Sequence, residues 1–307
     1  MKKITKALFF LLYVSLIFKT KAQQAPQFTN YTYNLSLINP AYVGSKDHVS
    51  FGFLGRSQWL GVKGAPTTIS IFFHSPLAKK MGVGFSLLHD KSGPVKETHV
   101  YSDFSYNLQI SDEEKLAFGI KSGATFQQIG ILELNQVNQN DSQFQQESSK
   151  IYPNFGAGAF YYNSKFYLSV SMPNLLETLH FEKSNGVITK AREKMHAFFT
   201  SGYIFNLKNN YKLKPSVLFK YVSNAPLSVD VSLNLLWQEK VEFGISHRLN
   251  DSWSGLINFN LTDMLRLGYA YDYTVSNFSD FNSGSHEFIL LYDLENLREN
   301  NNRIRFF

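Results

Sequence analysis

Side chains that could carry out chemistry are few in this 307-residue sequence, and their spacing forms no local reaction centre. The sequence has no cysteine, which excludes thiolate catalysis, zinc–thiolate sites and a disulfide framework. None of the eight histidines lies two, three or four residues from another, as a local metal motif requires. The adjacent pairs His74–Ser75 and Ser285–His286 would point to opposite sides of a strand. We therefore expect a non-enzymatic protein with no catalytic, metal or cofactor site.

Charged residues inside runs of alternating polarity are more informative. Six of them share the polar face of their run: Asp103, Lys121, Asp230, Glu242, Arg266 and Asp272. A Lys or Arg facing lipid at mid-bilayer would cost about 2–4 kcal/mol, so we expect these side chains to face a lumen. Two interpretations remain open. The charges could pair with one another and fix the strand register, or they could grip a peptide inside, in which case Asp103, Asp230, Arg266 and Asp272 are the candidate contacts.

These runs belong to a pattern that extends over residues 48–293. In 227–237, Val231, Leu233 and Trp237 share one face, while Asp230 and Asn234 share the other. Strands alternate sides in this way and helices do not. The predicted strands are 48–56, 67–74, 81–89, 97–109, 115–127, 153–162, 165–172, 195–206, 211–221, 227–237, 240–248, 252–260, 264–273 and 285–293. Most have about the 9–11 residues that a tilted strand needs to cross a bilayer. The sequence thus predicts an all-β, antiparallel transmembrane β-barrel of about 14 strands.

The predicted connections give an independent test of this fold. Short connections follow the even-numbered strands, and longer ones at 57–66, 90–96, 128–152, 173–194 and 274–284 follow odd-numbered strands. Connections 222–226 and 249–251 are short and weaken the contrast. Outer-membrane barrels alternate short periplasmic turns with longer external loops. A soluble β-sandwich is the alternative, but it has no reason to alternate loop lengths. Both termini are therefore expected in the periplasm.

The amino-terminal segment points to the same compartment. Basic residues precede an apolar run of twelve, residues 7–18, which suits a secretory signal peptide and is too short for a membrane-spanning helix. We expect residues 1–22 to be removed, with cleavage between Ala22 and Gln23. That segment holds five lysines, so the mature chain keeps about as many basic as acidic residues. No case for nucleic-acid binding remains. The 28 Phe and 17 Tyr suit a surface that contacts outer-membrane lipid.

Residues 23–46 show no clean period and are predicted to form an extended leader before the barrel at 47–293. Fourteen strands enclose more space than wall side chains fill, so the leader is the candidate plug of the lumen. Its candidate contacts for cargo or partner are Phe28, Tyr31, Asn39, Pro40 and Tyr42. In the first external loop, Trp59 is either part of an ordered contact loop or an interfacial anchor. Residues 294–307 are expected to form a periplasmic tail.

Several segments resemble the PorP/SprF family. The leader Gln24–Ser45, Arg56-Ser-Gln-Trp59, Gly64-Ala-Pro66, His74-Ser-Pro76, Gly268-Tyr-Ala-Tyr-Asp-Tyr273 and Asn282-Ser-Gly-Ser-His-Glu287 carry the resemblance. The matches extend from residue 24 to residue 287. The leader has Tyr31-Thr-Tyr-Asn-Leu35 where the family usually has Tyr-Met-Phe-Asn-Pro.

The resemblance implies an outer-membrane β-barrel of the type IX secretion and gliding-motility systems. Such a protein would bind the C-terminal region of a secreted cargo, such as a large surface adhesin, and retain or help export it. A periplasmic partner could be contacted through the N- or C-terminal segment. A general porin or small-solute transporter is the alternative, and it requires an open lumen.

Overall fold

The computed structural model describes residues 27–130, 148–176, 179–184, 187–192, 195–223 and 225–294. The predicted signal peptide, residues 131–147 of the predicted loop 128–152, and residues 295–307 of the predicted tail lie outside the described residues. In the described part of the chain, no helix is long and apolar enough to cross a membrane.

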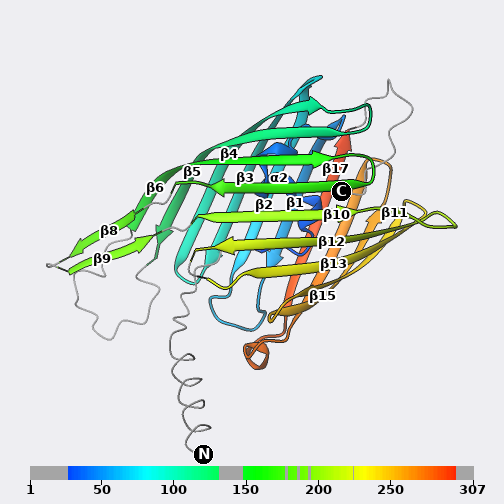
Figure 1. Cartoon of the computed structure of the whole chain (residues 1–307). Coiled ribbons are helices and arrows are strands. Elements are labelled where there is room, and N and C mark those ends of the chain that lie inside the picture. The colour runs from blue at the N-terminus through cyan, green and yellow to red at the C-terminus, as the bar shows by residue number, and fades with distance from the viewer. Residues whose placement is uncertain are drawn as a thin grey trace, which may run out of the picture.

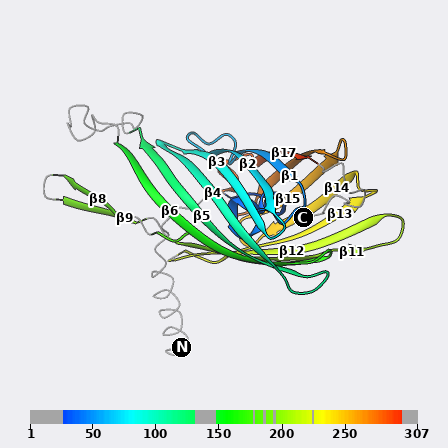
Figure 2. The same cartoon turned by 90° about the horizontal axis from the view of Figure 1, so that it is seen from above.

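The described strands form a closed antiparallel barrel (Figures 1 and 2). Its strands are β1 (Val49–Ser57), β2 (Thr67–Ala78), β3 (Met81–Ser92), β4 (Val95–Gln109), β5 (Lys115–Ile129), β6 (Ser148–Tyr162), β7 (Phe166–Asn174), β10 (His196–Tyr203), β11 (Phe205–Asn206), β12 (Tyr211–Val222), β13 (Ser228–Trp237), β14 (Val241–Arg248), β15 (Ser252–Asn260), β16 (Leu265–Thr274) and β17 (Ser285–Leu294). Since β10 and β11 both pair with β12 and are separated only by Ile204, they count as one strand. The described residues therefore form fourteen barrel strands.

Strand order follows chain order around the ring. Each strand pairs with its neighbour in sequence, β1 pairs with β17, and the two halves also join between β10 and β12. All fourteen predicted strands are present, and the largest shift in a boundary is at β6, which begins at Ser148 rather than at residue 153. The prediction of an all-β barrel with an even number of strands is confirmed.

Side chains alternate between the two faces of the wall as expected. The outward positions carry exposed apolar side chains such as Val231, Leu233 and Ile245. The inward positions carry buried polar ones, including Asp230 and Asn234. Because the side-chain period of a strand is two, this alternation fixes the register of each strand in the wall.

Two predicted connections are wrong in detail. The segment 90–96, predicted as a longer loop, is a two-residue turn, because β3 extends to Ser92 and β4 begins at Val95. The predicted loop 173–194 contains a separate antiparallel hairpin of β8 (Leu179–Ser184) and β9 (Val187–Arg192). The missed strand ends at 90–92 and 95–96 add only a few residues to long strands, and β8 and β9 have six residues each, so the alternation pattern gives little signal in either place.

The two rims of the barrel differ. One rim, here called the turn end, holds Val49, Leu294 and the connections 79–80, 110–114, 163–165, 207–210, 238–240 and 261–264. The other rim, here called the loop end, holds the connections 58–66, 130–147, 175–195 and 275–284, together with the short ones 93–94, 223–227 and 249–251. Short turns beside the first and last strands are typical of the periplasmic rim of outer-membrane barrels.

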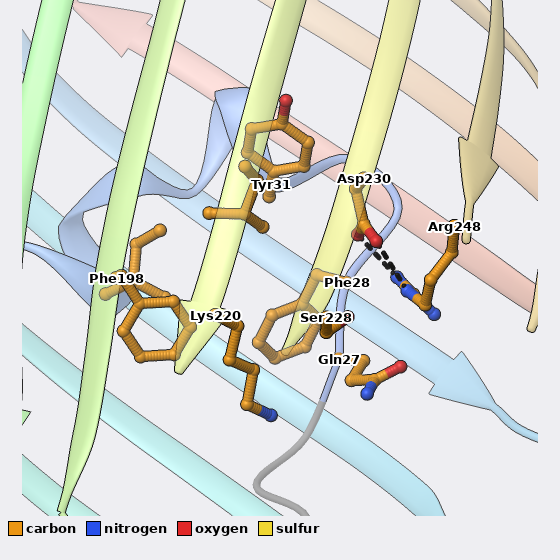
Figure 3. A pocket seen from close by; sticks show the side chains of 10 residues that line it. Gln27, Phe28, Tyr31, Phe198, Lys220, Ser228, Asp230 and Arg248 are labelled. Carbon is orange, nitrogen blue, oxygen red and sulfur yellow. Dashed lines mark hydrogen bonds and ion pairs between the residues drawn. The ribbon is translucent and has the colours of Figure 1, made fainter. Parts of the chain in front are cut away.

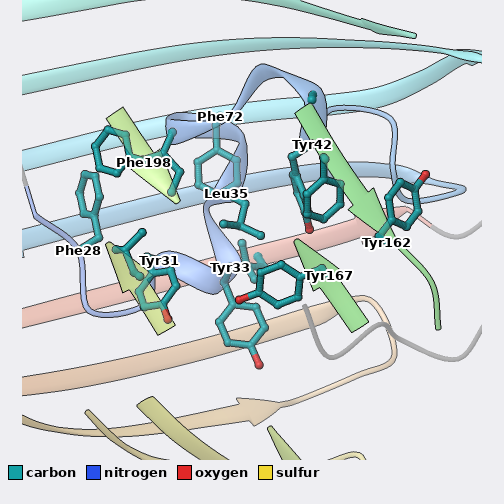
Figure 4. Packing of buried hydrophobic residues seen from close by; sticks show 14 of the residues in the cluster. Phe28, Tyr31, Tyr33, Leu35, Tyr42, Phe72, Tyr162, Tyr167 and Phe198 are labelled. Atoms are coloured by element: carbon teal, nitrogen blue, oxygen red, sulfur yellow. The ribbon is translucent and has the colours of Figure 1, made fainter. Parts of the chain in front are cut away.

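Residues 27–46, here called the leader, lie inside the barrel (Figures 1 and 2). The leader is not extended as predicted: it contains three single helical turns, η1 (Tyr31–Tyr33), α2 (Leu35–Ile38) and η2 (Pro40–Tyr42). Its apolar side chains, among them Phe28, Tyr31, Leu35 and Tyr42, pack against Phe72 and other inward side chains in the main buried cluster (Figure 4). The main buried cluster of the described residues therefore lies between the leader and the inner wall.

Candidate functional site in the barrel lumen

The leader turns sharply near Asn39 and Pro40, where local rules dictate its shape. Asn39 is extended, with φ −134° and ψ 111°, as the residue before a proline prefers. Its side-chain oxygen accepts a hydrogen bond from the backbone N–H of Ala41 at 2.9 Å. Pro40 occupies the first position of η2, where a missing N–H costs no helical hydrogen bond. This cap places the Asn39 amide group against the wall.

At the loop end, the wall holds the leader through the carboxylate of Glu287. That carboxylate accepts hydrogen bonds from the backbone N–H of Thr29 at 2.9 Å and of Asn30 at 2.7 Å, and from the Asn30 side chain at 3.0 Å. Arg56 pairs with both Glu287, at 3.2 Å, and Asp272, at 2.6 Å. Thr29 also donates to Asp272 at 2.7 Å. This cluster is buried, where an unpaired charge would be costly. The pairing of Arg56 with the two carboxylates and the hydrogen bonds from the leader offset that cost.

In the middle of the lumen, the wall surrounds the ring of Tyr33. Its hydroxyl donates to Glu242, which also accepts from Asn258 at 2.9 Å. The Lys214 ammonium lies 4.6 Å from the centre of the Tyr33 ring, and the Arg266 guanidinium lies 4.5 Å from it. Cations at this distance are attracted to the ring face. Tyr33 is thus held both at its hydroxyl and over its ring.

Wall side chains also donate to backbone carbonyls of the leader. Ser171 donates to Ile38 O at 2.8 Å, and Lys121, which is paired with Asp103 at 3.0 Å, donates to Ser36 O at 3.4 Å. The Asn39 amide group donates to the hydroxyl of Ser169 at 2.7 Å and to the carbonyl of Ala159 at 3.0 Å. The contacts of Ser171 and Lys121 satisfy backbone carbonyls that the short helix α2 leaves open.

Two glycines of the wall permit the leader to come this close. A Cβ atom at Gly119 would lie 2.3 Å from Ala41 N, and one at Gly158 would lie 2.1 Å from the side-chain oxygen of Asn39. Only a residue without a side chain fits at such contacts. The glycines therefore shape the inner wall to η2.

At the turn end, the leader joins the wall through a second set of contacts. Ser105 donates to Val43 O at 2.6 Å, and Lys46 pairs with Asp293 at 3.2 Å. Asp293 is the residue before the last one of β17. The leader therefore passes the whole height of the lumen before β1 begins.

A small pocket lies between the leader and the wall at the loop end (Figure 3). Its lining residues are Gln27, Phe28, Tyr31, Ile38, Phe198, Leu218, Lys220, Ser228, Asp230 and Arg248. Asp230 and Arg248 form a two-point ion pair across it, at 2.8 and 2.9 Å. Tyr31 donates to the hydroxyl of Ser216 at 3.1 Å.

Most of the residues selected from the sequence gather in the lumen. Asp103, Asp272 and Arg266 contact the leader directly or through one partner, whereas Asp230 pairs with Arg248 beside it. In the leader, Phe28, Tyr31, Asn39, Pro40 and Tyr42 are all buried against the wall. Trp59 lies apart from them in the loop 58–66. The centre of its ring is 4.9 Å from that of Phe278, and its backbone N–H donates to the hydroxyl of Ser285.

Several residues of the site were not selected from the sequence as contacts. Glu287, Arg56 and Lys214 are buried and hold the leader, yet only the first two appear in the motifs quoted above. The alternation pattern does not separate Glu287 from the inward apolar residues Ile289 and Leu291 on the same strand. In the described part of the chain, no group of three or more acidic or histidine side chains could hold a metal ion.

Comparisons with known proteins give the following matches. A family model described as "Type IX secretion system membrane protein PorP/SprF" matches residues 20–292. No curated protein matches. Among solved structures, the outer membrane protein Omp33 of Acinetobacter baumannii is 10% identical, with 81% of this chain and 99% of that chain covered and a TM-score of 0.47. A FadL homologue of Pseudomonas aeruginosa is also 10% identical, with 88% and 95% covered and a TM-score of 0.48.

Proposed function

Because the chain belongs to the PorP/SprF family of type IX secretion system membrane proteins, we propose that it binds a secreted cargo protein and retains it at the cell surface or helps to export it. The barrel places it in the outer membrane. The proposed cargo contact is the C-terminal region of a secreted protein such as a large adhesin, and it requires no catalytic step.

The observation that supports a binding role is how the wall recognises the leader. Glu287 accepts hydrogen bonds from two consecutive backbone N–H groups of the leader. Ser105, Ser171 and Lys121 donate hydrogen bonds to backbone carbonyls of the leader. These contacts bind the main chain of the leader, in addition to the contacts that the wall makes with side chains such as Tyr33 and Asn39.

The lumen charges fit both interpretations. Asp103 pairs with Lys121 and Asp230 with Arg248 across neighbouring strands, as charges that fix the register would. Asp272, Glu242 and Arg266 contact the leader, which supports a grip on a peptide with the leader of the same chain as that peptide.

The same contacts argue against a general porin. A porin needs a water-filled lumen, whereas here the leader and the inward side chains form the main buried cluster of the described residues. The contact with cargo is accordingly assigned to the loop end, where the connections 130–147, 175–195 and 275–284 lie. Loops of that length are usually functional when they are retained in a compact domain.

Surface proteomics of a deletion strain tests this proposal. We expect one large surface protein, or a small set of them, to disappear from the surface while growth and most secretion continue. Complementation with the wild-type chain is the control and should restore the lost proteins. An unchanged surface proteome, together with a defect in small-solute uptake, would replace the secretion role with transport.

A further inference from the structure

The leader enters the lumen from the loop end. Thr29 and Asn30 bond Glu287, the third residue of β17, and Thr29 bonds Asp272, two residues before the end of β16. Gln27 and Phe28 line the pocket with Ser228, the first residue of β13. All these wall residues lie at or near the loop end.

The leader leaves the lumen at the opposite rim. Val43 is bonded by Ser105 near the end of β4, and Lys46 pairs with Asp293 near the end of β17. Between the two rims, Tyr33, Ser36 and Asn39 contact the wall in turn. The chain thus runs through the barrel from the loop end to the turn end and only then starts β1.

From this path we infer that the mature protein presents its amino terminus at the outer face of the barrel, beside the external loops, and not in the periplasm as the alternation of loop lengths predicts. Cleavage before Gln23 would leave four residues, 23–26, ahead of Gln27. Four residues span at most about 14 Å when fully extended. The apolar band of an outer-membrane barrel is about 25 Å tall, so this segment is too short to return to the periplasmic rim.

The loop end is then the surface where the proposed cargo would bind. The identity of this partner rests on the proposed function. The pocket lined by Gln27, Phe28 and Lys220 then lies at the same end of the barrel as the amino terminus and the connection 275–284 (Figure 3). A secreted protein that reaches the cell surface would meet these elements together. A partner in the periplasm would instead meet the turn end and the residues that follow β17.

The absence of cysteine allows a direct test by single-cysteine labelling. Three variants, Gln27→Cys, Asn277→Cys in the loop 275–284 and Lys240→Cys in the turn 238–240, are treated on intact cells with a membrane-impermeant maleimide. We expect Gln27→Cys and Asn277→Cys to be labelled on intact cells, and Lys240→Cys only after the outer membrane is permeabilised. A short epitope inserted after Gln24, detected by antibody on intact cells, provides a second measurement that does not depend on thiol reactivity.

The outcomes separate this inference from the proposed function. If Gln27→Cys and the epitope become accessible only after permeabilisation, the inference is wrong, whatever the surface proteome of the deletion strain shows. If both are accessible on intact cells while the deletion strain keeps its surface proteins, the path of the leader stands and the cargo role falls.

Discussion

Replacing Glu287 with Gln should weaken the binding of the leader in the lumen. The side chain of Glu287 is fully buried (0% exposed) and accepts three hydrogen bonds from the leader, two of them from backbone N–H groups. Gln has the same shape as Glu but no charge. Its NH₂ group would face one of the leader N–H groups that now donate to Glu287, and two donors cannot form a hydrogen bond with each other. Hydrogen bonds to a charged group contribute about 1.5–3 kcal/mol and neutral ones about 0.5–1.5 kcal/mol, so each bond weakens by about 1 kcal/mol.

The expected loss of leader binding is therefore about 3 kcal/mol, which corresponds to a rise of roughly a hundredfold in the population with a displaced leader. Single-channel recording in planar bilayers measures this population as the probability of an open state. The wild-type protein should conduct little, a variant lacking residues 23–46 should conduct steadily, and Glu287→Gln should open intermittently.

The matched control is Asp230→Asn. Asp230 is also a buried carboxylate at the loop end, but its hydrogen bonds in the described structure go to Arg248 and not to the leader. We expect this variant to lose stability without a comparable rise in conductance. The reasoning is refuted if Glu287→Gln stays as closed as the wild type while the variant without residues 23–46 conducts. It is also refuted if that deletion variant does not conduct.

Three further predictions follow from the wall. Gly119→Val should displace η2 and increase conductance or reduce assembly, because its Cβ would lie 2.3 Å from Ala41 N. Gly255→Val is the control, since a Cβ there meets nothing within 4 Å. Equal effects of the two substitutions would contradict the prediction. Ile245 is 57% exposed on the outer face of the wall. Ile245→Arg should lower the free energy of unfolding by about 2–4 kcal/mol, measured by urea titration in detergent, whereas Ile245→Leu should not. The mature protein should fractionate with the outer membrane and migrate faster on a gel before boiling than after, and recovery in the soluble periplasm would be incompatible with the barrel.

The barrel could be predicted from the sequence because its physics is local. An outward Val231 beside an inward Asp230 follows from the two-residue period of a strand in contact with lipid on one side, and the same rule placed Arg266 and Asp272 inside. No neighbouring strand is needed to make this assignment. For the same reason, the strand boundaries agree with the structure to within a few residues over most of the wall.

The contacts of the lumen could not be predicted to the same extent. The helical turns of the leader are three or four residues long, too short to show a period, and they are stabilised by wall residues far away in sequence. Glu287 alternates with apolar residues that also face inward, since the leader offers an apolar surface to Ile289 and Leu291. Which charge meets which part of the leader depends on the closed ring and is not encoded in any one segment.

The position of Glu287 has a consequence for how the protein assembles. It lies 258 residues after Thr29, which it holds, and β17, which carries it, is also the strand that pairs with β1. The loop end of the leader therefore gains its main anchor only when the final strand of the barrel is in place. Contacts between such distant segments form late, because the entropy of closing the long intervening chain opposes them. A leader seated in the lumen would thus mark a completed barrel, and a chain halted before β17 would expose an unsecured leader to the proteases that remove unfinished proteins.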